Sequence, residues 1–214
     1  NPYSKRLGKL WLCKDKSPLG SLIRGKKSFW GVPFELAPIE GKYSAIQVAQ
    51  DAEGVPTVTS VLISDKARRI LIAHVCGQVR EGQSNAEDVT LEGTGDLIAR
   101  YRLVYVDGST IELPLRRRFE VHDIHVPWGH HPFLCRNCRH FGSVTLDETS
   151  IGYGQVQVGT FPIVDGCDNS GSDLDGWWLY DWVNPKPELE IAQLEIISDS
   201  PYPLAIGGIT LCDE

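Results

Sequence analysis

The sequence predicts an all-β fold, an antiparallel β-sandwich of jelly-roll type with a loop-rich insertion. Helical periodicity is scarce along the 214 residues. Instead, 21 glycines and 13 prolines separate short segments that are alternating or wholly apolar, which is typical of sandwiches and barrels. Half of the six tryptophans lie within residues 177–182. A chain of this length buries a substantial core, and we expect one domain of roughly eight to ten strands.

The first 28 residues are mixed and lysine-rich, and we interpret them as a leader segment that packs on a domain spanning 29–214. Strand regions are predicted over 29–36, 44–48 and 55–63, with an acidic turn at 51–54 before the last of them.

Residues 69–75 are apolar on both pleat faces, which predicts a central strand covered on both sides. Within it, His74 is expected to be a hydrogen-bonded core histidine rather than a ligand. Cys76 and Cys212 lie in apolar segments and are expected to act as small buried hydrophobes. The polar, glycine-bearing stretch 78–95 is predicted to be a long loop.

Residues 97–115 form the clearest hairpin, and the sequence indicates its register. A two-residue turn at Asp107 and Gly108 would pair Leu103 with Glu112. A three-residue loop, 106–108, instead pairs Leu103 with Ile111 and places Gly108 at the left-handed position that such loops require.

A slip of one residue would turn every side chain of this hairpin to the wrong face. We therefore predict the three-residue loop, which also pairs Tyr101 with Leu113. Arg100 and Arg102 then point outward from the sheet.

Residues 119–176 are rich in His, Cys, Gly and Asp and interrupt the β-pattern, so we assign them to an insertion. Alternating residues within 144–163 are compatible with a short extra hairpin. Regular strands are predicted to resume over 177–183, 189–197 and 204–211.

The bulk charge and hydropathy exclude two classes of partner. A formal net charge of −7 opposes a nucleic-acid surface, which needs a basic excess, and the run 116–118 is expected to be a solvated strand end. No apolar run approaches the ~20 residues of a membrane helix. Because the chain contains no methionine, Asn1 suggests a processed chain or an excised domain.

Four segments occur in a fixed order: 29–34 (FWGVPF), 69–74 (RILIAH), 105–110 (YVDGST) and 182–187 (WVNPKP). In that order they resemble the galactose-binding-like β-sandwich domains attached to bacterial polysaccharide-degrading and other secreted proteins. The resemblance covers roughly residues 29–115 and 176–212. It implies a jelly-roll sandwich, an extracellular or periplasmic location, and either sugar binding at a loop edge, often with a structural calcium, or a purely architectural role. The insertion departs from the pattern of these domains.

Cys135 and Cys138 have the spacing of half a zinc site, because two thiolates three residues apart can share one tetrahedral ion. His131 or His140, together with Cys167, are the candidate remaining ligands. Such a closed site would order a long loop rather than perform catalysis. A disulfide from Cys135 or Cys138 to Cys167, and reduced thiols with surface histidines, are the alternatives that the sequence leaves open.

The stretch 165–176 contains four aspartates among glycines and small residues. Calcium takes six to eight oxygen ligands from carboxylates and carbonyls, which flexible loops of this kind supply. Asp173 and Asp175 are therefore candidate calcium ligands, and a solvated acidic turn is the alternative.

The pair His122 and Asp123, followed by His125, places imidazoles beside a carboxylate, as general-base chemistry requires. The sequence shows no nucleophile, metalloprotease or nucleotide-binding motif beside it. We therefore expect an accessory module rather than an enzyme, with a metal-dependent hydrolase built on the insertion as one alternative.

In a strand, Trp178, Tyr180 and Trp182 share one face, and we expect that face to be buried against the opposite sheet. Trp128, in the insertion, is the better candidate for an exposed platform that stacks on a sugar.

The predicted function is a non-catalytic carbohydrate-binding or accessory module of a bacterial carbohydrate-active protein. Its ligand contacts are expected from Trp128, His125, Arg100 and Arg102. A structural domain that docks a catalytic neighbour or subunit is the second alternative. Expected partners are thus a carbohydrate and a catalytic domain or subunit, with no nucleic acid and no membrane.

Overall fold

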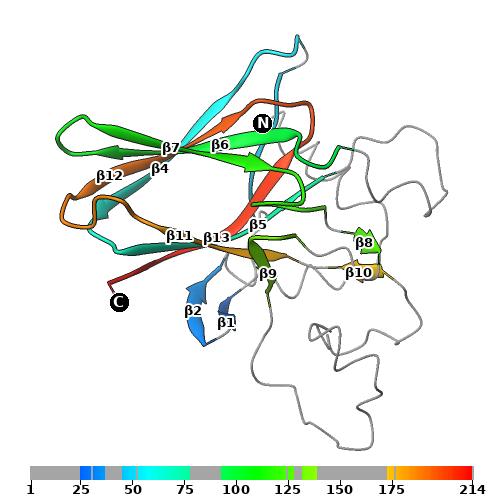
Figure 1. Cartoon of the computed structure of the whole chain (residues 1–214). Helices are drawn as coiled ribbons and strands as arrows, with labels where there is room; N and C mark the ends of the chain where they lie inside the picture. Colours follow the sequence, from blue (N-terminus) through cyan, green and yellow to red (C-terminus); the bar gives the residue numbers. More distant parts are fainter. Residues whose placement is uncertain are drawn as a thin grey trace, which may run out of the picture.

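A computed structural model describes residues 25–29, 31–36, 45–51, 53–77, 93–123, 125–127, 132–138, 173–175 and 177–213. For residues 27, 28, 125–127, 137 and 173–175 the structure describes the backbone and not the side chains. Within these ranges the chain is an antiparallel β-sandwich, which confirms the predicted fold class (Figure 1). The jelly-roll connectivity stays a prediction.

The two main sheets contain five and four strands. In spatial order the first sheet consists of β3 (Ile46–Val48), β13 (Leu204–Cys212), β5 (Arg69–Cys76), β11 (Trp178–Val183) and β9 (Cys135–Asn137). The second consists of β4 (Val58–Asp65), β12 (Ile191–Ser198), β6 (Leu97–Tyr105) and β7 (Thr110–Arg116). Two short antiparallel pairs accompany them: the hairpin of β1 (Lys26–Phe29) with β2 (Val32–Glu35), and the long-range pair of β8 (His125–Pro127) with β10 (Asp173–Asp175).

Strand β5 is central and buried along almost its whole length, as the apolar run predicts. One of its faces points to the four-stranded sheet, where His74 meets Tyr101. The other face belongs to the same core cluster as Phe34 and Leu36, because the β1–β2 pair packs on that side of β13 (Figure 1). The five-stranded sheet is therefore covered on both sides, which explains why β5 carries no polar alternation.

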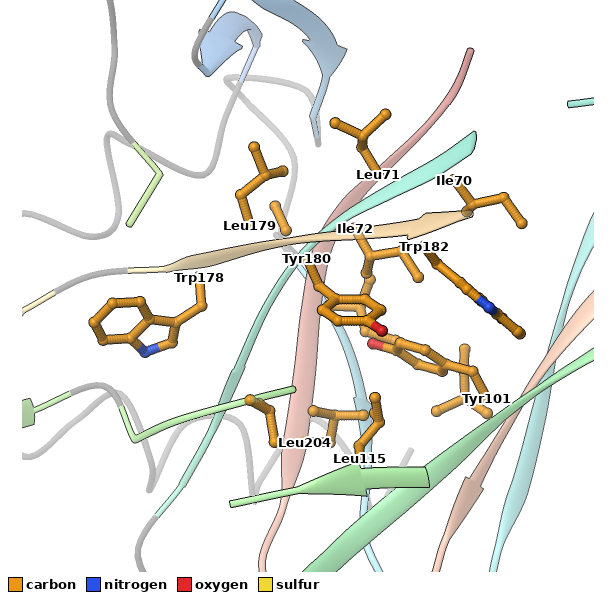
Figure 2. Close-up of a cluster of buried hydrophobic side chains, with 14 of the residues drawn as sticks. Ile70, Leu71, Ile72, Tyr101, Leu115, Trp178, Leu179, Tyr180, Trp182 and Leu204 are labelled. Atoms are coloured by element: carbon orange, nitrogen blue, oxygen red, sulfur yellow. The ribbon is translucent and has the colours of Figure 1, made fainter. Parts of the chain in front are cut away.

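The aromatic face of β11 is buried, as predicted. Trp178, Tyr180 and Trp182 lie on one side of the strand, with Tyr180 and Trp182 near Tyr101, while Leu179 lies on the other side (Figure 2). Period-two alternation puts these three rings on the inner face of the sandwich. They fill the core and are not available as an exposed sugar platform.

The β6–β7 hairpin has the predicted register. Tyr101 pairs with Leu113 and Leu103 with Ile111, and Gly108 has a φ of 80°. The amide of Gly108 donates to the carbonyl of Tyr105 at 2.9 Å, which closes the three-residue loop.

Three sequence predictions need correction. The single strand region expected over 29–36 is a hairpin that turns at Gly31, whose φ is 84°, and its first strand starts inside the expected leader. The insertion does not wholly interrupt the β-pattern, because β9 joins the five-stranded sheet beside β11. The run 116–118 is not a solvated strand end, because Arg117 is buried against Asp123.

Candidate functional site

The segment that follows β7 crosses one end of the sandwich and carries an unusual density of buried polar groups. Arg117, Glu120, His122 and Asp123 are all buried. Two hydrogen bonds fix the segment to the core: the amide of Cys76 donates to the carbonyl of His122 at 3.0 Å, and the Trp178 indole donates to the carbonyl of Asp123 at 2.9 Å. This end of the sandwich is therefore the first candidate for a functional site.

Asp123 is the centre of one polar group here, which we name the Asp123 cluster and which comprises Cys76, Arg117, His122, Asp123 and Trp178. The Nη1 atom of Arg117 donates to both carboxylate oxygens of Asp123, at 2.7 and 2.6 Å. The thiol of Cys76 donates to the same carboxylate at 3.3 Å, and the His122 ring stacks on Trp178.

Electrostatics make the Asp123 cluster a stable ion pair rather than a reactive centre. Burial alone would raise the pKa of Asp123, but the interaction with His122 and the charge of Arg117 hold that pKa below its ordinary value. Burial, and then the negative charge of Asp123, raise the pKa of the Cys76 thiol well above its ordinary value. Cys76 is consequently a neutral thiol at physiological pH.

A second group surrounds His74, and we name it the His74 cluster (His74, Tyr101, Glu120, Cys135 and Tyr180). The His74 Nε2 atom lies 2.8 Å from the Glu120 carbonyl oxygen. Since a carbonyl can only accept, Nε2 carries the proton, and Nδ1 accepts from the Tyr101 hydroxyl at 2.8 Å. The His74 ring also stacks on Tyr180.

The Cys135 thiol also donates to the Glu120 carbonyl and lies 3.8 Å from His74 Nε2. A catalytic cysteine needs a thiolate beside a proton acceptor. Here burial lowers the pKa of His74 to about 4, and burial raises the pKa of Cys135 well above its ordinary value. Both groups are neutral near pH 7. The His74 cluster therefore fixes Cys135, the first residue of β9, to the core.

The predicted metal sites are only partly described. Cys135 and Cys138 are both buried. Among the described residues, their thiols are not joined to each other in a disulfide. No three His, Cys, Asp or Glu side chains within the described ranges are grouped as a metal site would require. His131, His140 and Cys167 lie outside those ranges. Zinc, a disulfide to Cys167 and reduced thiols therefore all stay predictions.

Backbone pairing brings the strand that contains the candidate calcium ligands beside the strand that contains His125. Strand β10 contains Asp173 and Asp175, and it pairs with β8 so that Asp175 lies opposite His125. The sequence did not indicate this pairing, since the two strands are separated by nearly fifty residues. The calcium ligands and the ligand role of His125 stay predictions.

Arg100 and Arg102 point outward from the four-stranded sheet, as predicted, but their charges are neutralised there. Arg100 binds Asp199 through Nε and Nη2, both at 2.8 Å, and Glu112 through Nη1 at 3.0 Å. Arg102 binds Glu112 and Glu195. Hydrogen bonds from Arg102 and Arg100 lower the pKa of Glu112. These arginines form an ion-pair network across three strands, and a ligand would have to displace its carboxylates.

A surface that the sequence did not indicate lies beside the 116–123 segment. We name it the Phe133 surface and define it by Arg116, Arg118, Phe119, Phe133 and Leu134. Phe133 is 62% exposed and Leu134 is 54% exposed. The rings of Phe119 and Phe133 lie 5.2 Å apart, with the guanidinium of Arg116 4.7 Å from the first ring and that of Arg118 5.3 Å from the second.

Backbone pairing builds this surface from two distant segments. The amide of Phe133 donates to the carbonyl of Arg118 at 2.9 Å, and that of Leu134 donates to the carbonyl of Phe119 at 3.0 Å. Arg118 adopts a left-handed backbone with a φ of 67°, a conformation that non-glycine residues rarely occupy and that recurs at functional sites. Sequence patterns report local neighbours, so this long-range contact left no signal in them.

Trp128, the platform predicted from the sequence, lies outside the described residues. In the part of the chain that the structure describes, no helix is long and apolar enough to cross a bilayer. No protein-family model, no curated protein and no solved structure matches this chain.

Proposed function

We propose that this chain is a non-catalytic accessory module of a bacterial carbohydrate-active protein and that it binds carbohydrate through the Phe133 surface. The observation that carries the proposal is the exposed ring of Phe133, flanked by arginines, on a sandwich whose other described aromatic clusters are buried. The resemblance to galactose-binding-like sandwich domains points to the same ligand class and to an extracellular or periplasmic location.

The chemistry of the buried clusters supports a non-catalytic role. The thiols of Cys76, Cys135 and Cys138 have raised pKa values because they are buried. The imidazole of His74 is neutral and both of its nitrogens are hydrogen-bonded. Groups in this state stabilise a fold, since a nucleophile needs a thiolate and a general base needs a free nitrogen that reaches solvent.

The Phe133 surface combines the two features that sugar recognition uses. An exposed aromatic ring offers an apolar face of defined geometry on which a pyranose ring can stack. The guanidinium of Arg116 is paired with the carboxylate of Glu120, so the arginines contribute planar, positively charged groups at the rim of the platform, and a sugar carboxylate or hydroxyl is attracted to that charge. The guanidinium groups of Arg116 and Arg118 lie against the rings of Phe119 and Phe133, which holds them at the edge of the platform.

The test is a screen of the purified chain against immobilised polysaccharides and oligosaccharides, followed by titration of any ligand found. Phe133→Ala should weaken binding at least tenfold, equivalent to about 1.4 kcal/mol, whereas Phe133→Tyr keeps the ring and should retain binding. Val106→Ala is the matched control, because Val106 is 59% exposed at the tip of the β6–β7 hairpin. Failure of every glycan to bind, or equal affinities of Phe133→Ala and the control, would refute the proposal.

A parallel titration with EDTA addresses the predicted zinc or calcium. If a metal ion shapes the binding surface, EDTA should abolish binding and added zinc or calcium should restore it. Binding that is indifferent to EDTA would remove a metal from the proposed function.

A protein partner is the second candidate, and Leu134 is the observation that favours it. Leu134 is an exposed aliphatic residue beside Phe133, and interface centres are enriched in aromatic residues and arginine. The partner would be the catalytic domain or subunit that the module accompanies. A photo-cross-linking residue at position 133, but not at position 106, should then capture that domain, and Leu134→Ser should reduce the yield.

A further inference from the structure

Strand β4 is the edge strand of the four-stranded sheet. Within the described residues, the stretch 58–62 of its outer edge has no charge, proline or bulge to protect it, although Pro56 precedes this stretch and a bulge follows it. It is eight residues long and uncharged until Asp65. On its solvent face Val58 is 56% exposed and Leu62 is 80% exposed. Natural proteins protect such edges with charge, proline, bulges or short length, because an open edge accepts another strand.

The hydrogen-bonding pattern identifies which groups face outward. The amide of Ser198 donates to the carbonyl of Thr57 at 2.9 Å, and Ile197 pairs with Val58. In an antiparallel ladder, alternate residues bond to the same neighbour. Thr57 and every second residue after it therefore face β12, so the backbone groups of Val58, Ser60 and Leu62 point to the open edge.

The opposite edge of the same sheet is protected. On β7, Ser109 pairs with Tyr105 through the hydrogen bond from the Tyr105 amide, so the same alternation directs the backbone of residue 114 away from β6. That residue is Pro114, which has no amide to donate. In the five-stranded sheet, the edge strands β3 and β9 have three residues each. Among the described edge strands, β4 thus has the open stretch, from Val58 to Leu62, between Pro56 and the bulge at its end.

We propose that β4 is a strand-addition site and that its occupant is β4 of a second copy of this chain, in antiparallel register centred on Ser60. The strand is self-complementary about that residue, because Val58 and Leu62 lie two positions on either side of it on the solvent face. Val58 of one copy then lies opposite Leu62 of the other, and Ser60 lies opposite Ser60. About six backbone hydrogen bonds join the copies, two for each of these residue pairs.

Charge and backbone geometry both favour this register. It places Asp65 opposite Val55 of the second copy, so no like charges face each other. A β-bulge ends the flat part of the edge, since the β4–β12 register shifts after Leu62 and Ser64 has a left-handed φ of 53°. Bulges turn an edge away from pairing, which confines the contact to the stretch centred on Ser60.

The contact is small, and the dimer is accordingly weak and reversible. One strand pair with its flanking side chains buries less than the roughly 1,000 Å² of a stable interface. The dimer uses β4, whereas the proposed carbohydrate function uses the Phe133 surface, and each can fail without the other.

Sedimentation velocity of the full chain over about a hundredfold range of concentration tests the proposal, since the dimer fraction should rise with concentration. Leu62→Lys puts a charge beside the second copy and should weaken association at least tenfold. Val183→Lys, at another exposed strand position, should leave association unchanged. A chain that stays monomeric throughout, or a Leu62→Lys variant that dimerises like the parent, would overturn the proposal.

A covalent test reports the register independently. In a hydrogen-bonded antiparallel pair, opposite Cα atoms lie about 5.5 Å apart, within the range that a disulfide spans. Under mild oxidation Ser60→Cys should give a covalent dimer above the background of the parent chain, and Thr110→Cys on the protected β7 edge should not. Equal cross-linking of the two variants would contradict the Ser60-centred register.

Discussion

Replacing Asp123 with asparagine should destabilise the protein far more than the loss of a surface charge. The change keeps the shape of the side chain and removes its charge, so it leaves the Arg117 guanidinium buried without a counter-ion. Within the described residues, the hydrogen bonds of that guanidinium go to Asp123, and the side chain of Arg117 is 8% exposed. Breaking a buried pair in this way costs about 3–5 kcal/mol.

The matched control is Asp181→Asn, which breaks the ion pair between Arg69 and Asp181. Those side chains are 42% and 43% exposed, and exposed pairs contribute at most about 1 kcal/mol. Urea unfolding at pH 7 measures both free energies of unfolding. At about 2–4 °C per kcal/mol for a chain of this size, Asp123→Asn should also lower the melting temperature by roughly 10 °C.

The double variant Arg117→Met with Asp123→Leu tests the cause of the loss. If the loss comes from an uncompensated charge, removing both partners should recover much of the stability. Equal costs for Asp123→Asn and Asp181→Asn would show that Arg117 reaches solvent, and the account of the Asp123 cluster would then be wrong.

Three further predictions follow from single residues. Burial lowers the pKa of His74 to about 4 in the folded state, whereas it is about 6.5 in the unfolded chain, so the unfolded chain takes up the proton first as the pH falls. The free energy of unfolding should therefore fall by about 3 kcal/mol between about pH 6.5 and 4. His74→Gln should flatten that pH dependence in urea titrations. Gly208→Ala would place a Cβ 2.5 Å from Leu36 Cδ2 and 3.0 Å from Phe34 Cδ1, so it should cost about 1–3 kcal/mol through overpacking and increase hydrogen exchange in β2; unchanged exchange there would contradict the packing of β2 on β13. Gly108→Ala meets no atom within 4 Å but has a φ of 80°, so thermal unfolding should report about 1–2 kcal/mol of backbone strain and a smaller loss for Gly108→Asn.

Much of the fold could be predicted because it depends on local periodicity. The alternation along 97–115 and the left-handed requirement at Gly108 leave one register that keeps Leu103 on the inner face, and the structure has that register. The wholly apolar run of β5 requires cover on both faces, and the same pattern placed His74 in the core, where Tyr101 and Glu120 bind it.

The candidate site could be predicted only in part. Outward orientation of Arg100 and Arg102 follows from the pleat, but Asp199 and Glu195, which bind them, come from β12 or just after it. The spacing of Cys135 and Cys138 indicated a zinc site, a disulfide or reduced thiols, but a pattern of ligand types contains no information about the neighbouring strand. Pairing with β11 turned that stretch into β9.

In this protein the sequence by itself determined the all-β class, the doubly covered central strand and the hairpin register. These features depend on side-chain alternation and glycine stereochemistry, which act over a few residues. Only the tertiary structure decided which charges are buried and which edges are open. Arg117 and Arg118 are adjacent and chemically identical, yet the first is buried against Asp123 and the second lies over Phe133. Their environments are created by segments distant along the chain, and the energy of a charge depends on those surroundings rather than on its neighbours in sequence.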